Sequence, residues 1–387
     1  MPGAQHQTRP APTGGASLVV VGAGNIGSYL LPHLGRMDRV DRVIIVDRDV
    51  YACGNLRSQS ISAADLGRPK AQVMARRLRA ANPTLQIVAI HDTLENVPPA
   101  LLRADIWLTC LDSRAARQVA NERFYRLGVP LWIDAGVQPA NLLARVSLYA
   151  PGRDAPCLEC LWDEDDYRDI ALSYACDGTP TQPASTNGIS ALGALAAALQ
   201  ALECRAALAA EQPASLAARE LVVNAATHQS FVTSLRRNTR CRFDHFAWQP
   251  TPMPAAWRTV TDIARAAGNP GDHAFLQVEG RAFVHAVGCQ GCGRRVDVAL
   301  VDARVSPGSL RCRGCGALIP LPWDAVRDRL ALAGRSNGHG RLSLRSIGLR
   351  RGDLLTVRAG DQEQHFEVHF AQSAPAPASA TRRSRHG

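Results

Sequence analysis

The sequence is poor in aromatic residues, which make up 5% of its 387 positions. Proteins that bind single-stranded nucleic acid stack the bases on exposed aromatic side chains. The arginines are scattered and form no aromatic-interleaved basic stripe, so nucleic-acid binding is disfavoured although the net charge is +10. We therefore expect the positive charge to favour an acidic protein partner.

The sequence also shows no signal peptide, no internal repeat and no uninterrupted membrane span. Residues 189–210 are rich in alanine and leucine, but Glu203 and Arg205 interrupt them, which favours a buried helix over a membrane helix. Eleven cysteines without a secretory leader indicate a reducing compartment, where paired cysteines bind metals more often than they form disulfides. A cytoplasmic protein without membrane contact is expected.

The positions of proline and glycine predict where secondary-structure elements and domains begin and end. Apolar strands alternate with helical segments, including 71–81 and 115–127, which is typical of an α/β fold with a Rossmann-like, mostly parallel sheet. Short strands are predicted near the C-terminus at 342–347, 354–357 and 365–370. The predicted parts are a disordered segment (1–16), an α/β domain (17–248), a linker with a helical stretch (249–279), a cysteine-rich ribbon (280–340), a small β segment (341–372) and a disordered tail (373–387).

A glycine-rich turn follows the first apolar strand, at Gly22, Gly24 and Gly27. These glycines allow a tight turn, close approach of the backbone to a phosphate, and close packing of the next helix on the sheet. Asp47 follows the second predicted strand (43–46) and lies 20 residues beyond Gly27, where its carboxylate can accept hydrogen bonds from ribose hydroxyls. The pattern predicts a nucleotide site but does not identify the nucleotide.

Three charged residues after this turn favour phosphate chemistry. Transfer of an adenylyl group needs cations around a triphosphate, and Arg57 and Lys70 are suited to that task. Asp112 follows a further apolar strand and so lies at the carboxyl end of the sheet, where it can hold Mg²⁺. The alternatives are that the cations are merely solvated and that Asp112 caps the helix that begins near Ser113.

Two C-x-x-C pairs, each followed by glycine, predict a zinc ribbon in the C-terminal half. Cys289 and Cys292 are separated by 19 residues from Cys312 and Cys315. Four thiolates give a closed structural zinc site with no position for water. A redox dithiol, the alternative, would need one such pair on a βαβ unit.

The order of these motifs resembles the ThiF/MoeB/HesA family, the bacterial relatives of ubiquitin-activating enzymes, over roughly residues 17–246. The resemblance implies that ATP adenylates the C-terminal glycine carboxylate of a small ubiquitin-like or sulfur-carrier protein. It implies a nucleotide site formed by Gly22, Gly24, Gly27, Asp47, Asn55, Arg57, Lys70, Asp112 and Arg117. Asp112, Lys70 and Arg57 would be the catalytic residues.

The sequence departs from the family pattern in two places. The family usually reads Asn-Leu-x-Arg-Gln, whereas this chain reads Asn55-Leu-Arg57-Ser-Gln59, with the arginine one place early. The family's N-terminal helix, which can lend an arginine to a neighbouring subunit, has no clear counterpart in residues 1–16. A homodimer therefore remains an open expectation.

The resemblance also implies a second zinc site and a reactive cysteine. Cys157 and Cys160 match half of the family's structural site, and Cys241 with His245 occupies the place of the missing pair. The alternative is an incomplete site with His245 on the surface. Cys176, in a loop rich in glycine and proline, matches the region where a family member can accept the activated glycine. Cys53, Cys110 and Cys204 lie in or beside apolar stretches and are expected to be packed thiols.

We thus expect an adenylyltransferase that uses ATP, Mg²⁺ and Zn²⁺, acts on a partner with a C-terminal glycine and passes the acyl group to Cys176 or onward to a conjugating enzyme. Activation of a sulfur carrier for cofactor biosynthesis is the competing hypothesis. Two hypotheses from different classes are a nucleotide-binding scaffold with reduced catalysis and a nicotinamide oxidoreductase.

Overall fold

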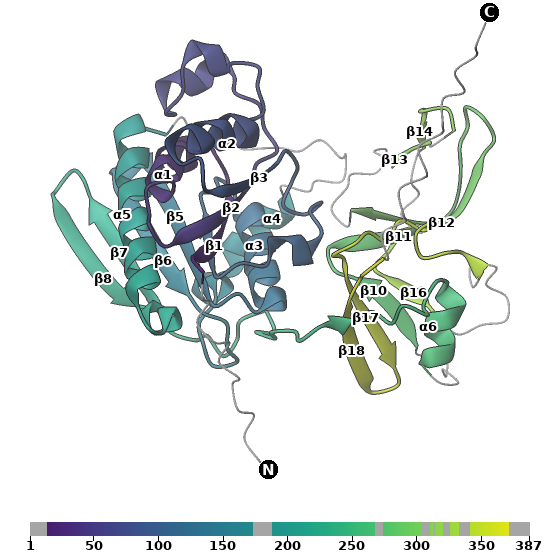
Figure 1. Ribbon diagram of the computed structural model, residues 1–387. Coiled ribbons are helices and arrows are strands. Elements are labelled where there is room, and N and C mark those ends of the chain that lie inside the picture. The colour runs from purple at the N-terminus through teal and green to yellow at the C-terminus, as the bar shows by residue number, and fades with distance from the viewer. Residues whose placement is uncertain are drawn as a thin grey trace, which may run out of the picture. The chain divides into compact units, whose positions relative to one another are not determined.

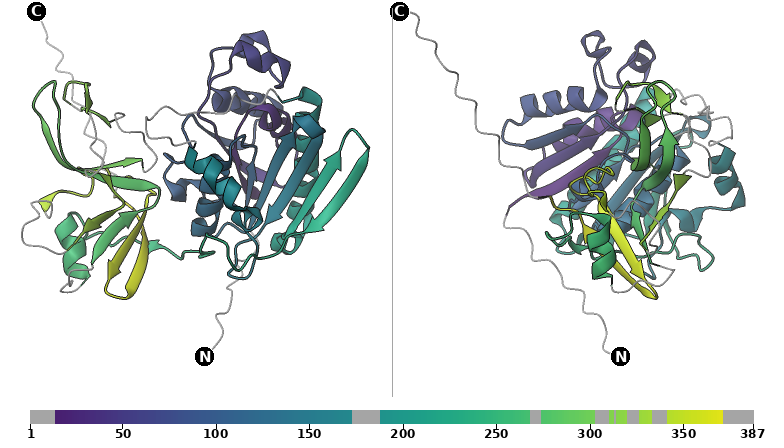
Figure 2. Two further views of the ribbon diagram at one scale, coloured as in Figure 1. Left: turned by 180° about the vertical axis from the view of Figure 1, so that it is seen from behind. Right: turned by 90° about the vertical axis from the view of Figure 1, so that its right-hand side faces the viewer.

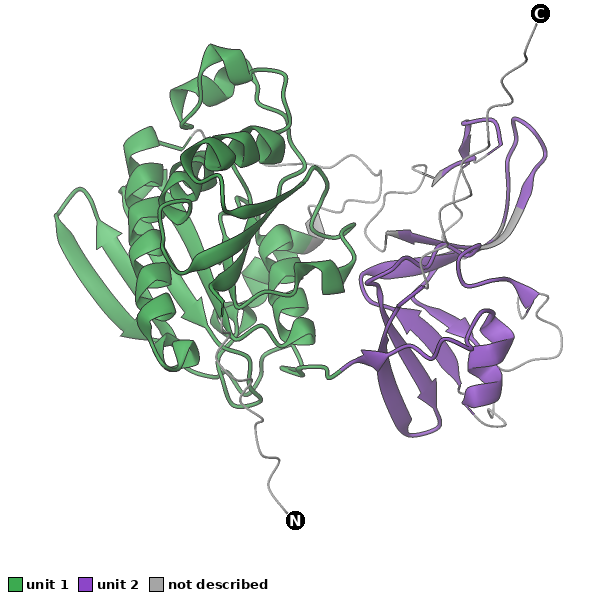
Figure 3. Cartoon of the chain, in the orientation of Figure 1, with its two compact units in different colours: residues 1–249, 304–309 green, residues 250–303, 310–387 purple. Residues whose placement is uncertain are grey.

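The computed structural model describes residues 14–172, 188–267, 274–302, 310–312, 314–319, 326–332 and 341–370. It divides into two compact units, shown in separate colours in Figure 3. The first contains the chain up to Gln249, and the second begins at Pro250.

The first unit is built on an eight-stranded sheet with the order β3-β2-β1-β4-β5-β6-β7-β8. The first five strands in this order are parallel, and β6, β7 and β8 are added antiparallel. The predicted mostly parallel sheet is therefore confirmed. The strands are β1 (Ala16–Val21), β2 (Val40–Val46), β3 (Gln86–Ile90), β4 (Ile106–Thr109), β5 (Leu131–Gln138), β6 (Leu143–Tyr149), β7 (Arg219–Asn224) and β8 (Gln229–Ser234).

Helices cover both faces of this sheet (Figures 1 and 2). Helices α1, α2 and α5 cover one face, and α3 and α4 lie on the other. The α-helices of the first unit are α1 (Asn25–Leu34), α2 (Lys70–Ala81), α3 (Arg114–Leu127), α4 (Glu164–Leu172) and α5 (Ser190–Ala209). The 3₁₀ turns are η1 (Cys53–Arg57), η2 (Ala63–Asp65), η3 (Pro99–Leu102), η4 (Pro139–Asn141), η5 (Leu158–Leu161) and η6 (Pro213–Leu216). The helices predicted at 71–81 and 115–127 are present as α2 and α3.

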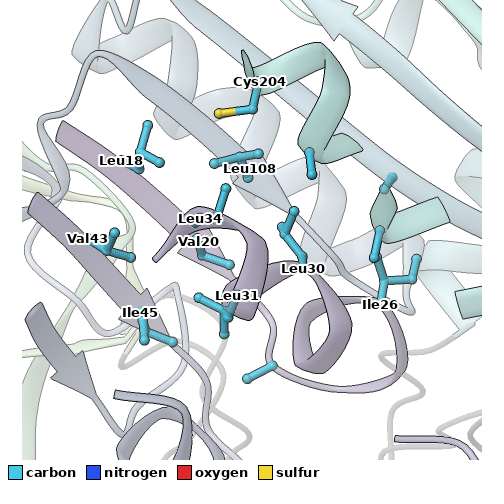
Figure 4. Close-up of a cluster of buried hydrophobic side chains, with 14 of the residues drawn as sticks. Leu18, Val20, Ile26, Leu30, Leu31, Leu34, Val43, Ile45, Leu108 and Cys204 are labelled. Atoms are coloured by element: carbon cyan, nitrogen blue, oxygen red, sulfur yellow. The ribbon is translucent and has the colours of Figure 1, made fainter. Parts of the chain in front are cut away.

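The core between the sheet and α1 explains why the glycine turn is rigid. Figure 4 shows Leu18 and Val20 of β1 facing Leu30 and Leu34 of α1, all of them fully buried. Burying side chains of this size stabilises the fold by about 1.5–3 kcal/mol each. Because β1 and α1 are held on both sides of residues 22–24, the turn between them has little freedom to move.

Helix α5 is the alanine- and leucine-rich segment that the sequence suggested to be a buried helix. It is long and apolar enough to span a membrane by length and composition alone. In this fold it packs against α1 and the sheet, and Ala196, Ala197 and Cys204 are fully buried. It is thus a core helix of the first unit.

The second unit is mainly β-structure around its own core. A five-stranded sheet has the order β16-β10-β17-β18-β9, and smaller sheets have the orders β12-β11-β15 and β13-β14. Helix α6 (Val260–Ala266) begins with a capping box between Thr259 and Asp262. The strands are β9 (Thr251–Pro252), β10 (Phe275–Val278), β11 (Arg281–Gly288), β12 (Arg295–Asp302), β13 (Leu310–Arg311), β14 (Leu318–Ile319), β15 (Val326–Arg327), β16 (Arg329–Ala331), β17 (Leu354–Ala359) and β18 (Gln362–Glu367).

One predicted strand of this unit is wrong. Strands form at Leu354–Ala359 and Gln362–Glu367, near the segments expected, but 342–347 is a bridge followed by turns. Ser343 makes a single β-bridge to Thr259, and Leu344 and Ile347 bury their side chains in the core. Their spacing of three residues fits a turn and not the alternation of a strand.

Candidate nucleotide site and metal centres

The glycine turn joins β1 to α1 and is packed too tightly for side chains at two of its positions. Gly22 has a φ of +97°, and a Cβ on it would lie 2.6 Å from the carbonyl oxygen of Cys110. A Cβ on Gly27 would lie 2.0 Å from the carbonyl oxygen of Gly22. At Gly24, the residue before α1, the nearest atom to a Cβ is 3.9 Å away. Gly24 therefore faces open space, as close approach of a ligand to the backbone requires.

Asp47 holds this turn from the end of β2. One oxygen of its carboxylate accepts the N–H of Ala23 at 2.6 Å, and the other accepts the N–H of Asp49 at 2.8 Å. Burial raises the pKa of Asp47, while the nearby Lys70 and the two N–H donors act in the opposite direction. Each oxygen keeps lone pairs for further donors, such as the ribose hydroxyls that the sequence suggested.

Tyr51 is a further support of the turn, which the sequence pattern did not indicate. Its buried hydroxyl donates to the carbonyl oxygen of Ala23 at 2.9 Å. Burial, together with the charge of Asp47, raises its pKa, so the hydroxyl keeps its proton. The local sequence Val50-Tyr51-Ala52 gave no indication that the phenol of Tyr51 would contact the glycine turn.

Lys70 lies beside this assembly as the first residue of α2. Its side chain is buried, and its Nζ lies 3.0 Å from Oδ2 of Asp49 and 5.8 Å from the centroid of the Tyr51 ring. A β-bridge between Val50 and Pro69 closes the loop that leads from β2 to α2. The strand ends thus bring Lys70, Asp47 and the glycine turn together.

The segment with Asn55, Arg57 and Gln59 lies against the start of α1. The N–H of Ser60 donates to Oγ of Ser28 at 2.9 Å, and Gln59 Nε2 is the atom that faces Gly24. The side-chain oxygen of Asn55 accepts the N–H of Ala52 and so caps η1. Arg57 is exposed and, within the described part of the chain, has no ion pair or hydrogen bond.

Asp112 lies just beyond β4, in the loop that passes under Gly22. Its side chain is exposed and has no partner among the described residues. The cap of α3 is Ser113, whose Oγ accepts the N–H of Ala116 at 3.2 Å, so the interpretation of Asp112 as the cap is wrong. A free carboxylate at this position suits a hard cation such as Mg²⁺.

Arg117 is part of an ion-pair network centred on Asp134 of β5. Its Nε lies 3.1 Å from Oδ2 of the fully buried Asp134, which also pairs with Arg145 at 3.4 Å. Thr109 donates to the other oxygen of Asp134 at 2.6 Å. A Cβ on Gly136 would lie 3.0–3.1 Å from the guanidinium groups of Arg145 and Arg117, so a larger residue at this position would crowd both arginines. Of this network, the sequence pattern indicated Arg117 alone.

Several buried polar atoms near the turn have no partner within the described protein. They are both side-chain atoms of the Asn25 amide, at the start of α1, and Oε1 of Gln59. Unpaired buried polar groups are costly and rare, so each requires a reason. The Asn25 amide packs against Gly188 and Gly193, whereas the side-chain amide of Gln59 faces Gly24. The open space at Gly24 and the N–H groups at the start of α1 fit a nucleotide with its phosphates there.

The first metal-type cluster joins two distant segments of the first unit. The ligand atoms of Cys157, Cys160, Cys241 and His245 all lie within 4.8 Å of one another. Sγ of Cys157 is 3.9 Å from that of Cys160 and 3.7 Å from that of Cys241. A tetrahedral zinc ion with bonds of about 2.3 Å would separate its sulfur ligands by about 3.8 Å, so the cluster fits zinc.

His245 completes this cluster from the inside of the fold. Its side chain is buried, which rules out the alternative of a surface histidine. Nε2 lies 3.5 Å from Sγ of Cys160, while Nδ1 lies 3.4 Å from the hydroxyl of Tyr125. A hydrogen bond to one ring nitrogen fixes the orientation in which the other can bind a metal.

Residues 14–243 match the ThiF family. The chain belongs to the ThiF family. Its large α/β sheet is thus that of a ThiF domain, and the resemblance stated from the motifs is confirmed.

Three curated relatives of this ThiF chain carry the names of sulfur-carrier adenylyltransferases or of a NEDD8-activating enzyme. The Escherichia coli sulfur carrier protein ThiS adenylyltransferase is 29% identical over 153 residues, 39% of this chain and 59% of that protein. The Saccharomyces cerevisiae NEDD8-activating enzyme E1 catalytic subunit is 32% identical, over 38% of this chain and 51% of that protein. The Thermus thermophilus sulfur carrier protein adenylyltransferase is 34% identical, over 38% and 55%. This chain thus spans between half and three fifths of the length of these relatives.

Among solved structures, the ThiF chain is similar to E. coli MccB with ATP, at 23% identity and a TM-score of 0.47. The similarity covers 59% of this chain and 65% of MccB.

The second metal-type cluster lies outside the part that matches the ThiF family. The ligand atoms of Cys289, Cys292, Cys312 and Cys315 lie within 4.8 Å of one another, with Sγ–Sγ distances of 3.5 Å (Cys289–Cys315) and 3.6 Å (Cys292–Cys312). Gly293 and Gly316, one after each pair, have φ values of +71° and +75°. The two turns are alike: in each, the glycine N–H donates to the carbonyl of the first cysteine at 2.8 Å. Four sulfurs at these distances suit zinc.

The remaining cysteines of the ThiF chain differ in accessibility. Cys204 is buried in the core and Cys110 packs beneath the glycine turn, as expected. Cys53 is exposed on η1, so the prediction of a packed thiol is wrong there, because its apolar neighbours form a turn and not a strand. Cys176 lies outside the described residues.

Proposed function

We propose that this ThiF chain adenylates the C-terminal carboxylate of a small ubiquitin-like or sulfur-carrier protein, using ATP and Mg²⁺. Its relatives carry names of sulfur-carrier adenylyltransferases and of a ubiquitin-like-protein activating enzyme. The observation that carries the proposal is the gathering of the glycine turn, Asp47 and Lys70 at the carboxyl ends of β1 and β2. A dinucleotide-binding oxidoreductase has no need of the buried lysine.

In this reaction a carboxylate oxygen of the partner attacks the α-phosphorus of ATP. The bond from the α-phosphorus to the bridging oxygen breaks, pyrophosphate leaves, and a mixed anhydride with AMP remains. The turn from Gly22 to Gly27 would seat the phosphates, and Asp47 would hold the ribose. Lys70 and Arg57 would neutralise the phosphates while Asp112 holds Mg²⁺.

The step after adenylation separates two versions of the proposal. If the partner is ubiquitin-like, the thiolate of Cys176 attacks the acyl carbon, AMP leaves, and a thioester forms for delivery to a conjugating enzyme. If the partner is a sulfur carrier, the adenylate is the product that sulfur transfer consumes. A thiol-reducible adduct that is lost in Cys176→Ala supports the first version, and an adduct that persists in that variant excludes Cys176.

We propose that both metal clusters have structural roles and no catalytic role. Zinc in the first would tie residues 157–160 to the segment at 241–245, and zinc in the second would hold the C-terminal ribbon together. Because the ribbon lies outside the ThiF match, we assign it to docking of the partner or of a conjugating enzyme. We also propose that the protein forms a homodimer. A cytoplasmic location is proposed because the cysteines of the described residues form no disulfide.

Exchange of labelled pyrophosphate into ATP tests the proposal. We expect exchange that depends on Mg²⁺ and on a carrier protein ending in Gly-Gly, and that is lost when the last glycine is removed. Nucleotide binding without exchange, with every carrier encoded near this gene, would favour a scaffold with reduced catalysis, a hypothesis that the displaced Arg57 makes worth testing.

A further inference from the structure

Lys70 is the only lysine in the sequence. The chain has 44 lysine and arginine residues in all, so every other permanently cationic side chain is an arginine. Surface positions accept either cation, whereas a position that needs a compact, rotatable ammonium does not accept a planar guanidinium. The single lysine in a chain that otherwise uses arginine singles out position 70 as one where an ammonium has a specific role.

The surroundings of Lys70 do not favour a cation. Its side chain is 8% exposed, and it stands at the first residue of α2, where the helix dipole is positive. A buried charge needs a partner of opposite sign. Among the described residues, the carboxylate of Asp49 is the partner within hydrogen-bond distance, at 3.0 Å from Nζ.

Asp49 is also fixed with respect to Lys70 through the backbone. The N–H of Lys70 donates to the carbonyl oxygen of Asp49 at 2.9 Å, and the N–H of Asp49 donates to Asp47 at 2.8 Å. Asp47 in turn accepts the N–H of Ala23 in the glycine turn. A continuous set of hydrogen bonds therefore sets the distance between the ammonium and the turn.

The carboxylate of Asp49 also pairs with a second cation, Arg48, and the two ion pairs can be compared. Nε of Arg48 lies 3.6 Å from Oδ1 of Asp49, and both side chains are more than half exposed. Exposed ion pairs of this kind contribute little to stability. If Asp49 has a role in the site, it acts through the buried Lys70 and not through Arg48.

We propose that Asp49 is a positioning residue that holds the ammonium of Lys70 against the glycine turn for the phosphates of the nucleotide, and that an arginine at position 70 cannot perform this role. The inference rests on the proposed function, since it assigns Lys70 to the phosphates. It adds Asp49 to the proposed nucleotide site, and it adds the requirement that the cation at position 70 is an ammonium and not a guanidinium.

The test is a double-mutant cycle with two measurements. The variants Asp49→Asn, Lys70→Met and the double variant are compared for Mg-ATP affinity by calorimetry without a partner, and for kcat and KM in pyrophosphate exchange. Arg48→Ala is the matched control, and thermal melting verifies folding. Asp49→Ser replaces Asp49→Asn if the latter does not fold.

We expect Lys70→Met to lower kcat/KM about 100-fold and Asp49→Asn about tenfold. The double variant should equal Lys70→Met, because Asp49 then has no ammonium to position. Lys70→Arg should be as poor as Lys70→Met, and Arg48→Ala should stay within about twofold of the parent.

Two results would overturn the inference. Additive losses in the double variant would mean that Asp49 contacts Mg²⁺ or the nucleotide independently. A Lys70→Arg variant with parental activity would remove the requirement for an ammonium. If the parent protein binds Mg-ATP but exchanges no pyrophosphate with any carrier, the proposed function fails, while the affinity measurements still decide the roles of Asp49 and Lys70.

Discussion

At the scale of single residues, the glycines of the turn separate packing from ligand contact. Gly27→Ala should destabilise the protein by at least about 2 kcal/mol, because the new Cβ would meet the carbonyl of Gly22 at 2.0 Å. Gly24→Ala should fold normally, because its Cβ meets only Gln59 at 3.9 Å. It should nevertheless weaken Mg-ATP binding about tenfold or more by filling the space that the phosphates require. Calorimetry and thermal melting measure both effects, and a Gly24→Ala variant with parental affinity would move the phosphates away from this turn.

Asp112 provides a second test at this scale. Its side chain is exposed and unpaired in the described chain, so Asp112→Asn should leave the melting temperature unchanged. Pyrophosphate exchange should fall about 100-fold, because the charge that holds Mg²⁺ is lost. Asp38→Asn, at another exposed carboxylate, is the control. Unchanged exchange in Asp112→Asn at limiting Mg²⁺ would remove this residue from the site.

At the scale of elements, Asp65 fastens the loop between β2 and α2. Its buried carboxylate accepts the N–H and hydroxyl of Ser62 and pairs with Arg77 of α2 at 2.5 Å. Although burial opposes it, these hydrogen bonds and the charge of Arg77 lower the pKa of Asp65 below its ordinary value of 3.8. Its stabilisation is therefore present above pH 3.8 and is lost as the pH falls through the lowered pKa.

Asp65→Asn should thus cost about 1–3 kcal/mol at neutral pH, measured by urea unfolding. The difference from the parent should shrink below pH 3.8. Because this loop carries Arg57 and leads to Lys70, the variant should also raise the KM for Mg-ATP. A difference in stability that is independent of pH would show that packing, and not the charge, accounts for it.

The first metal cluster is a further element that can be tested separately. We expect about two zinc ions per chain by elemental analysis, one for each cluster. His245→Ala should reduce the content to about one and lower the melting temperature, whereas His245→Cys should keep both ions, since thiolate and imidazole are equivalent ligands. Cys53→Ser should leave the content unchanged, because Cys53 belongs to neither cluster. Full zinc content in His245→Ala would contradict the assignment of this histidine.

The features that could be predicted from the sequence are those encoded by neighbours in the chain. The glycine turn, the C-x-x-C pairs and the alternation of strands and helices in the first unit are local patterns, and these were found where expected. The network of Asp134 with Arg117 and Arg145 could not be predicted, because three elements meet only when the sheet is assembled. The same is true of Tyr51, whose hydroxyl reaches a residue 28 positions earlier. Where local pattern and packing disagree, as at Cys53 and at 342–347, packing decides.

At the scale of the whole molecule, the chain combines a ThiF domain with a separate β-rich unit that carries its own zinc-type cluster. The first unit contains every described residue of the proposed nucleotide site, while the second contains the ribbon. If the ribbon serves docking, Cys312→Ser should raise the KM for the carrier or lower transfer to a conjugating enzyme, and should leave the affinity for Mg-ATP unchanged. Loss of nucleotide affinity in this variant would contradict the division of roles between the two units.

We propose above that the nucleotide site joins AMP to the terminal carboxylate of a polypeptide. The most direct measurement uses a carrier protein whose C-terminal carboxylate is labelled with ¹⁸O, followed by mass spectrometry of the AMP released when the acyl group is transferred. Because the carboxylate oxygen attacks the α-phosphorus, we expect one ¹⁸O atom in AMP and none in pyrophosphate. Unlabelled AMP, or label in any other phosphate product, would contradict it.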